Sequence, residues 1–130
     1  MKSLVPYLTF NGDCEQALNF YKEVFEGEIV YIKRFKDSPI EASSGDLEKV
    51  FDSEITFGAH TVKASDTVPP FEYNSGNNIS LFIGLQLEEK VVKAKVDKLS
   101  QGGTMLFPFA NGFAMFLDKY NIQWMIHNVA

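Results

Sequence analysis

The feature that most constrains this chain is an order of secondary-structure elements that occurs twice within 130 residues. Each half, about 60 residues long, follows the order strand, helix and three strands. The expected strands lie at 4–10, 28–35, 49–58 and 60–66 and again at 79–87, 104–109, 113–118 and 121–128, with helices at 14–25 and 88–100. Few side chains match between the halves, so the repeat rests on the order of elements.

The segment 14–25 shows why a helix is expected. Asp13, followed three residues later by Gln16, is the pattern of a helix N-cap with a capping box. Apolar residues then recur at helical spacing and form one stripe: Ala17, Phe20, Tyr21, Val24 and Phe25. Gly27 follows, and we expect the helix to end there.

Strict alternation along 49–58 separates two faces of a strand. The apolar face, expected to pack under the helix, holds Phe51, Ile55 and Phe57, and the other face holds Asp52, Glu54 and Thr56. In the first strand Pro6 lacks the N–H that a central strand needs, which predicts an edge position or a strand end there.

The predicted fold is α+β, built from two βαβββ modules that form a cupped, open-barrel mixed sheet with the helices outside. Each module is a sheet with a helix on one face only, so its other face must be covered or must line a cleft. We expect one domain over residues 1–130, with module one at about 1–66, a linker rich in proline, glycine and asparagine at 67–77, and module two at 78–130.

Composition excludes several partners. A formal net charge of −5 argues against nucleic acid or an anionic membrane as the main partner, and no apolar run approaches a membrane span. The single cysteine, Cys14, fits a reducing compartment, and the first ten residues lack the pattern of a secretory signal. We therefore expect a cytoplasmic protein.

Several stretches, taken in order, resemble a known family: PYLTFNGDCEQALNFYKEVF, KASD, NNISLF, LSQGGT and DKYNIQWMI. They are similar to the PhnB-like branch of the vicinal oxygen chelate superfamily, which includes glyoxalase I, extradiol dioxygenases and bleomycin- or fosfomycin-resistance proteins. The resemblance covers nearly the whole chain and implies paired βαβββ modules and a homodimer. Such chains are often described as demethylubiquinone methyltransferases, but no glycine-rich nucleotide-binding loop follows a strand here.

Metal-dependent members of the superfamily use four inward-facing ligands, and the resemblance places those positions on this chain. They fall on Pro6, on Ser65 or Asp66, on Asn78 and on Met125. Proline offers no ligand, and a methionine sulfur is too soft for the usual divalent ions of such sites. We therefore expect neither the standard metal site nor another cofactor.

Strand alternation names the side chains that face the expected cleft. The candidate binding residues given by alternation are Asp52, Glu54, Lys63, Ser65, Asn78, Ser80, Gln123 and Met125. Phe107 is added from the phenylalanine-rich stretch MLFPFANGFAMF, whose rings exceed what core packing needs. Asp52 and Glu54 lie one pleat apart, about 6–7 Å. If enclosed together, one carboxyl would have a raised pKa and could act as an acid or base, whereas a nearby Lys63 would make a structural ion pair instead. Trp124, out of phase with Gln123 and Met125, should pack under a helix.

Three function classes remain open. The preferred hypothesis is a homodimeric glyoxalase- or bleomycin-resistance-like protein that binds a small aromatic or apolar molecule in the cleft without turning it over. The alternative is a lyase, isomerase or dioxygenase-type enzyme of the same superfamily, using a metal or acid–base chemistry. A purely structural role would predict a filled cleft.

Overall fold

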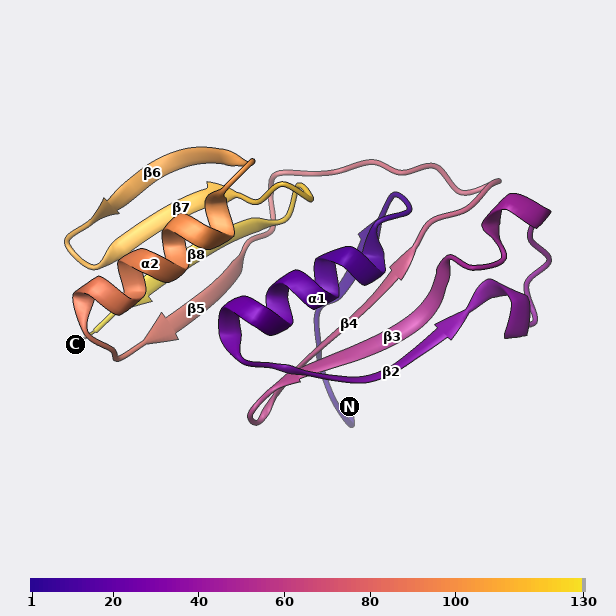
Figure 1. Cartoon of the computed structure of the whole chain (residues 1–130), viewed down its shortest axis with the longest axis horizontal. Helices are drawn as coiled ribbons and strands as arrows, with labels where there is room; N and C mark the ends of the chain where they lie inside the picture. The colour runs from indigo at the N-terminus through magenta and orange to yellow at the C-terminus, as the bar shows by residue number, and fades with distance from the viewer. Residues whose placement is uncertain (130) are drawn as a thin grey trace. The chain divides into compact units, whose positions relative to one another are not determined.

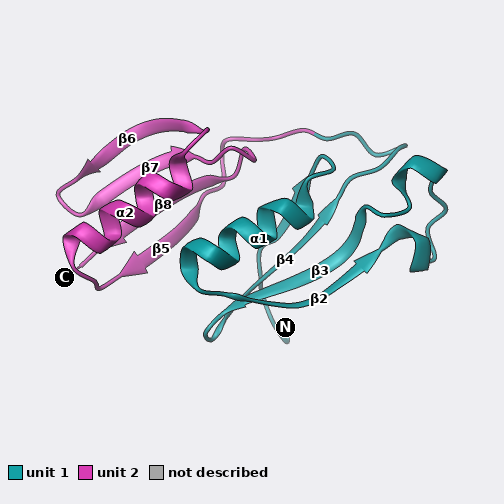
Figure 2. Cartoon of the chain, in the orientation of Figure 1, with its two compact units in different colours: residues 1–73 teal, residues 74–130 magenta. Residues whose placement is uncertain are grey.

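The computed structural model describes residues 1–129, and the chain divides into two compact units, residues 1–73 and 74–130 (Figures 1 and 2). Unit one contains β1 (Tyr7–Phe10), α1 (Cys14–Phe25), β2 (Glu28–Arg34), two short 3-10 turns, η1 (Phe35–Asp37) and η2 (Ser44–Asp46), β3 (Val50–Phe57) and β4 (His60–Asp66). Unit two contains β5 (Leu81–Leu85), α2 (Glu89–Ser100), β6 (Thr104–Ala110), β7 (Phe113–Leu117) and β8 (Gln123–Asn128). The predicted α+β class and the two βαβββ modules are confirmed.

Both units have the same sheet topology. The strand order is β1-β4-β3-β2 in unit one and β5-β8-β7-β6 in unit two, and neither four-stranded sheet is closed. The parallel pairs are β1 with β4 and β5 with β8, which are the first and last strands of each unit along the chain. The remaining pairs are antiparallel. β1 is an edge strand that begins directly after Pro6, as the missing N–H predicts. The prediction of one domain with a linker at 67–77 stays a prediction.

Each helix covers one face of its own sheet (Figure 1). In unit one, Leu18, Tyr21 and Val24 of α1 are buried together with Phe10, Ile55 and Ala64 of the sheet. In unit two, α2 buries Val92, Val96 and Leu99. The buried strand residues of the same unit are Ala114, Phe116, Trp124 and Ile126. Trp124 is therefore under the helix as predicted, and its indole N–H donates to Asp118 at 2.8 Å. Among the described residues of each unit, no second helix covers the opposite face of its sheet.

The start of α1 is held by a carboxylate from a strand that lies far away in the chain. Asp13 occupies the N-cap position but makes no capping hydrogen bond through its side chain, so the predicted capping box is wrong. Asp66, at the end of β4, accepts instead from the backbone N–H groups of Gly12 and Cys14 through Oδ1, and from that of Val50 through Oδ2. One buried side chain thus ties the ends of three segments together, because it satisfies N–H groups that no local partner reaches.

No helix among residues 1–129 combines the length and the apolar character that crossing a membrane would require.

The cap predicts a large difference between two aspartates. Asp66→Ala should lower the free energy of unfolding by about 3 kcal/mol or more, since three backbone donors lose their acceptor. Asp13→Ala, the matched control, should change it by less than about 0.5 kcal/mol. Urea denaturation of both variants measures this. Equal losses in the two variants would contradict the assignment of Asp66 as the cap.

Candidate functional site

The open face of sheet one carries a row of polar side chains that crosses all four strands. Cross-strand pairing places Tyr7 beside Lys63, Lys63 beside Glu54, and Glu54 beside Tyr31. Asp52, two residues before Glu54 on β3, shares this face. The row forms because these residues alternate with the buried ones on each strand. The sequence-predicted residues Asp52, Glu54 and Lys63 are therefore neighbours in the structure.

Asp52 is the centre of a hydrogen-bonded cluster on this face. Its Oδ1 accepts from the hydroxyl of Tyr7 at 2.8 Å, and its Oδ2 accepts from the hydroxyl of Tyr31 at 2.8 Å. The Lys63 ammonium lies 3.3 Å from the same Oδ2 and also donates to the Tyr31 hydroxyl. The Lys63 Nζ also lies 5.2 Å from the centroid of the Tyr31 ring. Two phenols and an ammonium thus fix one carboxylate in place.

The cluster sets the ionisation of its members. Burial tends to raise the pKa of Asp52, but the hydrogen bonds from Tyr31, Tyr7 and Lys63 outweigh it and leave that pKa lowered. The hydrogen bond to Tyr31 raises the pKa of Lys63, and burial raises the pKa of Tyr7 to about 12. Near neutral pH the cluster therefore holds an ion pair and a neutral Tyr7. The Asp52–Lys63 pair is the structural ion pair expected from the sequence as one alternative. Because the pKa of Asp52 is lowered, the carboxyl is ionised near neutral pH and has no proton to donate.

A pocket of about 360 Å³ opens beside the cluster. It shares the open face, because its residues Thr9 and Ser65 lie two positions after Tyr7 and Lys63 on β1 and β4. Its apolar lining includes the rings of Phe35, Phe51 and Phe71, and its hydroxyl lining comes from Thr9, Ser65 and Thr67. Rings and hydroxyls around a small concave volume are the usual composition of a small-molecule site.

Phe51 reaches this pocket because β3 does not alternate strictly. The pairing of β2 with β3 shifts register between the pairs Lys33–Asp52 and Arg34–Val50, so Phe51 is an extra residue at an irregularity. Its ring packs edge-on against Phe35, with centroids 5.5 Å apart, and lines the pocket. The prediction that Phe51 packs under the helix beside Ile55 is therefore wrong.

The candidates of unit two lie on or near the open face of sheet two. Met125 and Phe107 belong to a row that crosses this sheet through cross-strand neighbours: Phe82, Met125, Met115 and Phe107. Gln123 is buried and donates through Nε2 to the Ser80 hydroxyl. Asn78 is exposed and precedes β5, which begins two residues later than predicted. The open face of unit two is therefore mainly apolar, in contrast to that of unit one.

Sequence reasoning missed four aromatic residues that build the site in unit one: Tyr7, Tyr31, Phe35 and Phe71. A signal existed for Tyr7, which is out of phase with the buried Phe10 on β1 and so must face the open side. Phe35 and Phe71 lie outside the strands, in a 3-10 turn and in the segment after β4, where alternation gives no guide.

The residues at the superfamily's metal positions do not fit a divalent ion. Both oxygens of Asp66 already accept backbone hydrogen bonds, and its side chain is buried. Pro6 has no donor atom to offer, and the Met125 sulfur is a soft ligand. Within residues 1–129, no three His, Cys, Asp or Glu side chains gather as a metal site would require.

Comparison with known proteins agrees with this fold. The family model of 3-demethylubiquinone-9 3-methyltransferase matches residues 2–127. Protein PA1353 from Pseudomonas aeruginosa has a TM-score of 0.86 at 26% identity over 98% of both chains, and a PhnB protein from Bacillus cereus has a TM-score of 0.79 at 25% identity over 98% of this chain and 100% of its own. Protein YjdN from Escherichia coli is 23% identical over 97% of this chain and 95% of its own. The fosfomycin resistance protein FosX from Mesorhizobium loti shares the fold, with a TM-score of 0.57 at 14% identity over 100% of this chain and 94% of its own.

The paired βαβββ units and these neighbours define a PhnB-like fold of the vicinal oxygen chelate type. The chain belongs to the 3-demethylubiquinone-9 3-methyltransferase family, whose model spans nearly its whole length.

The Asp52 cluster predicts a specific pH dependence of stability. The folded pKa of Asp52 is below its ordinary value of 3.8, so its stabilisation is present above about pH 4 and is lost as pH falls through the folded pKa. Asp52→Asn should therefore lower the free energy of unfolding by about 2 kcal/mol near neutral pH. On acidification, the difference in unfolding free energy between the variant and wild type should shrink. Urea unfolding across the acid range measures this. Glu54→Gln, which removes another carboxylate from the same face, is the control. A difference in unfolding free energy between Asp52→Asn and wild type that widens on acidification would contradict the lowered pKa of Asp52.

Proposed function

We propose that this protein binds a small aromatic or apolar molecule in the pocket of unit one, without the divalent metal site of its superfamily. The observation that supports this most directly is the pocket itself, about 360 Å³ in volume, with three phenylalanine rings and three hydroxyl groups in its lining. Burying an aromatic ring there would supply most of the binding free energy, and the hydroxyls of Thr9 and Ser65 would orient the ligand.

The cluster beside the pocket acts in this proposal as a rigid wall. Its donors and acceptors are largely matched to one another: Asp52 accepts from Tyr7, Tyr31 and Lys63. Such a matched network holds the strand face in one arrangement and lowers the cost of ordering the site when ligand binds. The acid–base alternative needs a group that exchanges its proton near neutral pH, and the pKa directions of Asp52, Lys63 and Tyr7 work against it.

We also propose that the protein is a homodimer in which a second copy covers the apolar face of unit two. The row on that face ends at Phe82, which is 60% exposed, and at Phe107, which is 59% exposed. Two methionines, Met125 and Met115, lie between these rings. A contiguous apolar strip of this kind is typical of a protein interface, because leaving it in water is costly.

Ligand binding should raise the melting temperature in the presence of EDTA. A panel of neutral aromatic alcohols that includes tryptophol is a suitable set of probes. Phe71→Ala should abolish the shift with little loss of basal stability, because Phe71 lines the pocket yet is 67% exposed. Val30→Ala, which removes another exposed apolar side chain of the same unit, should retain it. A shift that needs added metal, or that survives in Phe71→Ala, would contradict the proposal, as would no shift with any probe.

The dimer proposal predicts a change of mass in solution. Light scattering coupled to size exclusion should give twice the chain mass of 14.7 kDa for the wild type and the chain mass for Phe107→Glu. Leu4→Glu, at an 85% exposed position outside both sheets, should stay dimeric. A monomeric wild type, or a Phe107→Glu variant that remains a dimer, would count against this face as the interface.

A further inference from the structure

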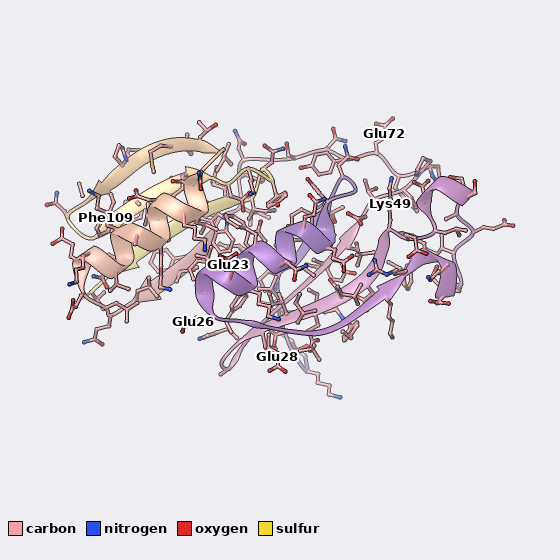
Figure 3. The ribbon with its side chains drawn as sticks, viewed as in Figure 1. Glu23, Glu26, Glu28, Lys49, Glu72 and Phe109 are labelled. Carbon is pink, nitrogen blue, oxygen red and sulfur yellow. The ribbon has the colours of Figure 1, made fainter. Side chains whose placement is uncertain are left out.

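The charges that line the unit-one pocket are all of one sign. Only two of its lining residues are ionisable, and both are carboxylates, Asp66 and Glu72. Asp66 is 5% exposed and already accepts from three backbone N–H groups. Glu72 is exposed on the segment that follows β4 (Figure 3) and makes no hydrogen bond or ion pair with another of residues 1–129. One carboxylate at the rim is therefore available to a ligand.

The lysine of the Asp52 cluster does not offset that charge. The Lys63 ammonium lies 3.3 Å from Asp52, and its cross-strand neighbour on β3 is a second carboxylate, Glu54. An anionic ligand would meet no uncompensated positive group in the pocket, and it would be repelled by Glu72. A cation would meet Glu72 and the faces of the lining phenylalanine rings, both of which attract positive charge.

We propose that the ligand class of this pocket is an aromatic amine in its ammonium form, with its ring among Phe35, Phe51 and Phe71 and its ammonium beside Glu72. This inference rests on the proposed binding function of the same pocket and adds the charge of the ligand. The aromatic lining provides affinity for the ring, and the rim carboxylate provides selection between ligands of equal shape.

Three indole probes of similar shape test the charge preference by isothermal titration calorimetry at neutral pH: tryptamine is a cation, tryptophol is neutral, and indole-3-propionate is an anion. Tryptamine should bind about two- to fivefold more tightly than tryptophol, which is the range expected for one exposed ion pair, and indole-3-propionate should bind most weakly. Added salt should narrow the tryptamine–tryptophol ratio.

In the Glu72→Gln variant, the affinity for tryptamine should fall to the affinity that the same variant has for tryptophol. Glu28→Gln is the matched control, because Glu28 is an exposed carboxylate of the same unit that lies far from Glu72 in Figure 3. Equal binding of the three probes, or a tryptamine preference that persists in Glu72→Gln, would overturn the inference while leaving the binding function intact. Binding of none of the probes would overturn both.

Discussion

A four-stranded sheet with a single helix can cover only one of its faces, and the rest of this protein follows from that constraint. In each unit the covered face is closed by apolar packing between the helix and alternate strand residues. The uncovered face receives the other half of every strand, because successive side chains point to opposite sides. The uncovered face therefore presents side chains that the packing under the helix does not use.

The two units share one topology but have filled this uncovered face differently. In equivalent strand order, unit one carries Tyr7, Lys63, Glu54 and Tyr31, and unit two carries Phe82, Met125, Met115 and Phe107. The first row combines two tyrosine rings with two charged side chains and borders a pocket, which suits recognition of a small molecule. The second is apolar and half-exposed at its ends, which suits contact with another protein surface. One repeated scaffold can thus supply a binding face and an assembly face.

Element order and helix periodicity were sufficient to predict the fold. The helix at 14–25 and the strand at 60–66 match α1 and β4 residue for residue, since both have a strong period and clear boundaries. Sequence reasoning failed where the decisive contact is distant or irregular. Asp66 caps α1 from 52 residues away in the chain, and local pattern favours Asp13 instead. The register shift at Phe51 moves one ring to the pocket, and alternation alone cannot place such a shift.

For the candidate site, too, the residues on strands could be predicted and those outside the strands could not. Asp52, Glu54, Lys63 and Ser65 could be placed on one face, because they alternate with buried residues on β4 and on the part of β3 that follows its irregularity. The rings of Phe35 and Phe71 could not, because they enter from segments without a strand period. The hydrogen-bonded Asp52 cluster also depends on side-chain directions across four strands, which spacing does not encode.

The central claim, that the unit-one pocket binds an aromatic molecule without metal, can be tested most directly by amide chemical-shift mapping. Isotope-labelled protein in EDTA would be titrated with tryptamine and its backbone resonances followed. Saturable shifts concentrated at Phe35, Phe51, Ser65 and the 67–72 segment are the expected result. Shifts confined to unit two, or shifts that arise only after a divalent metal is added, would contradict it.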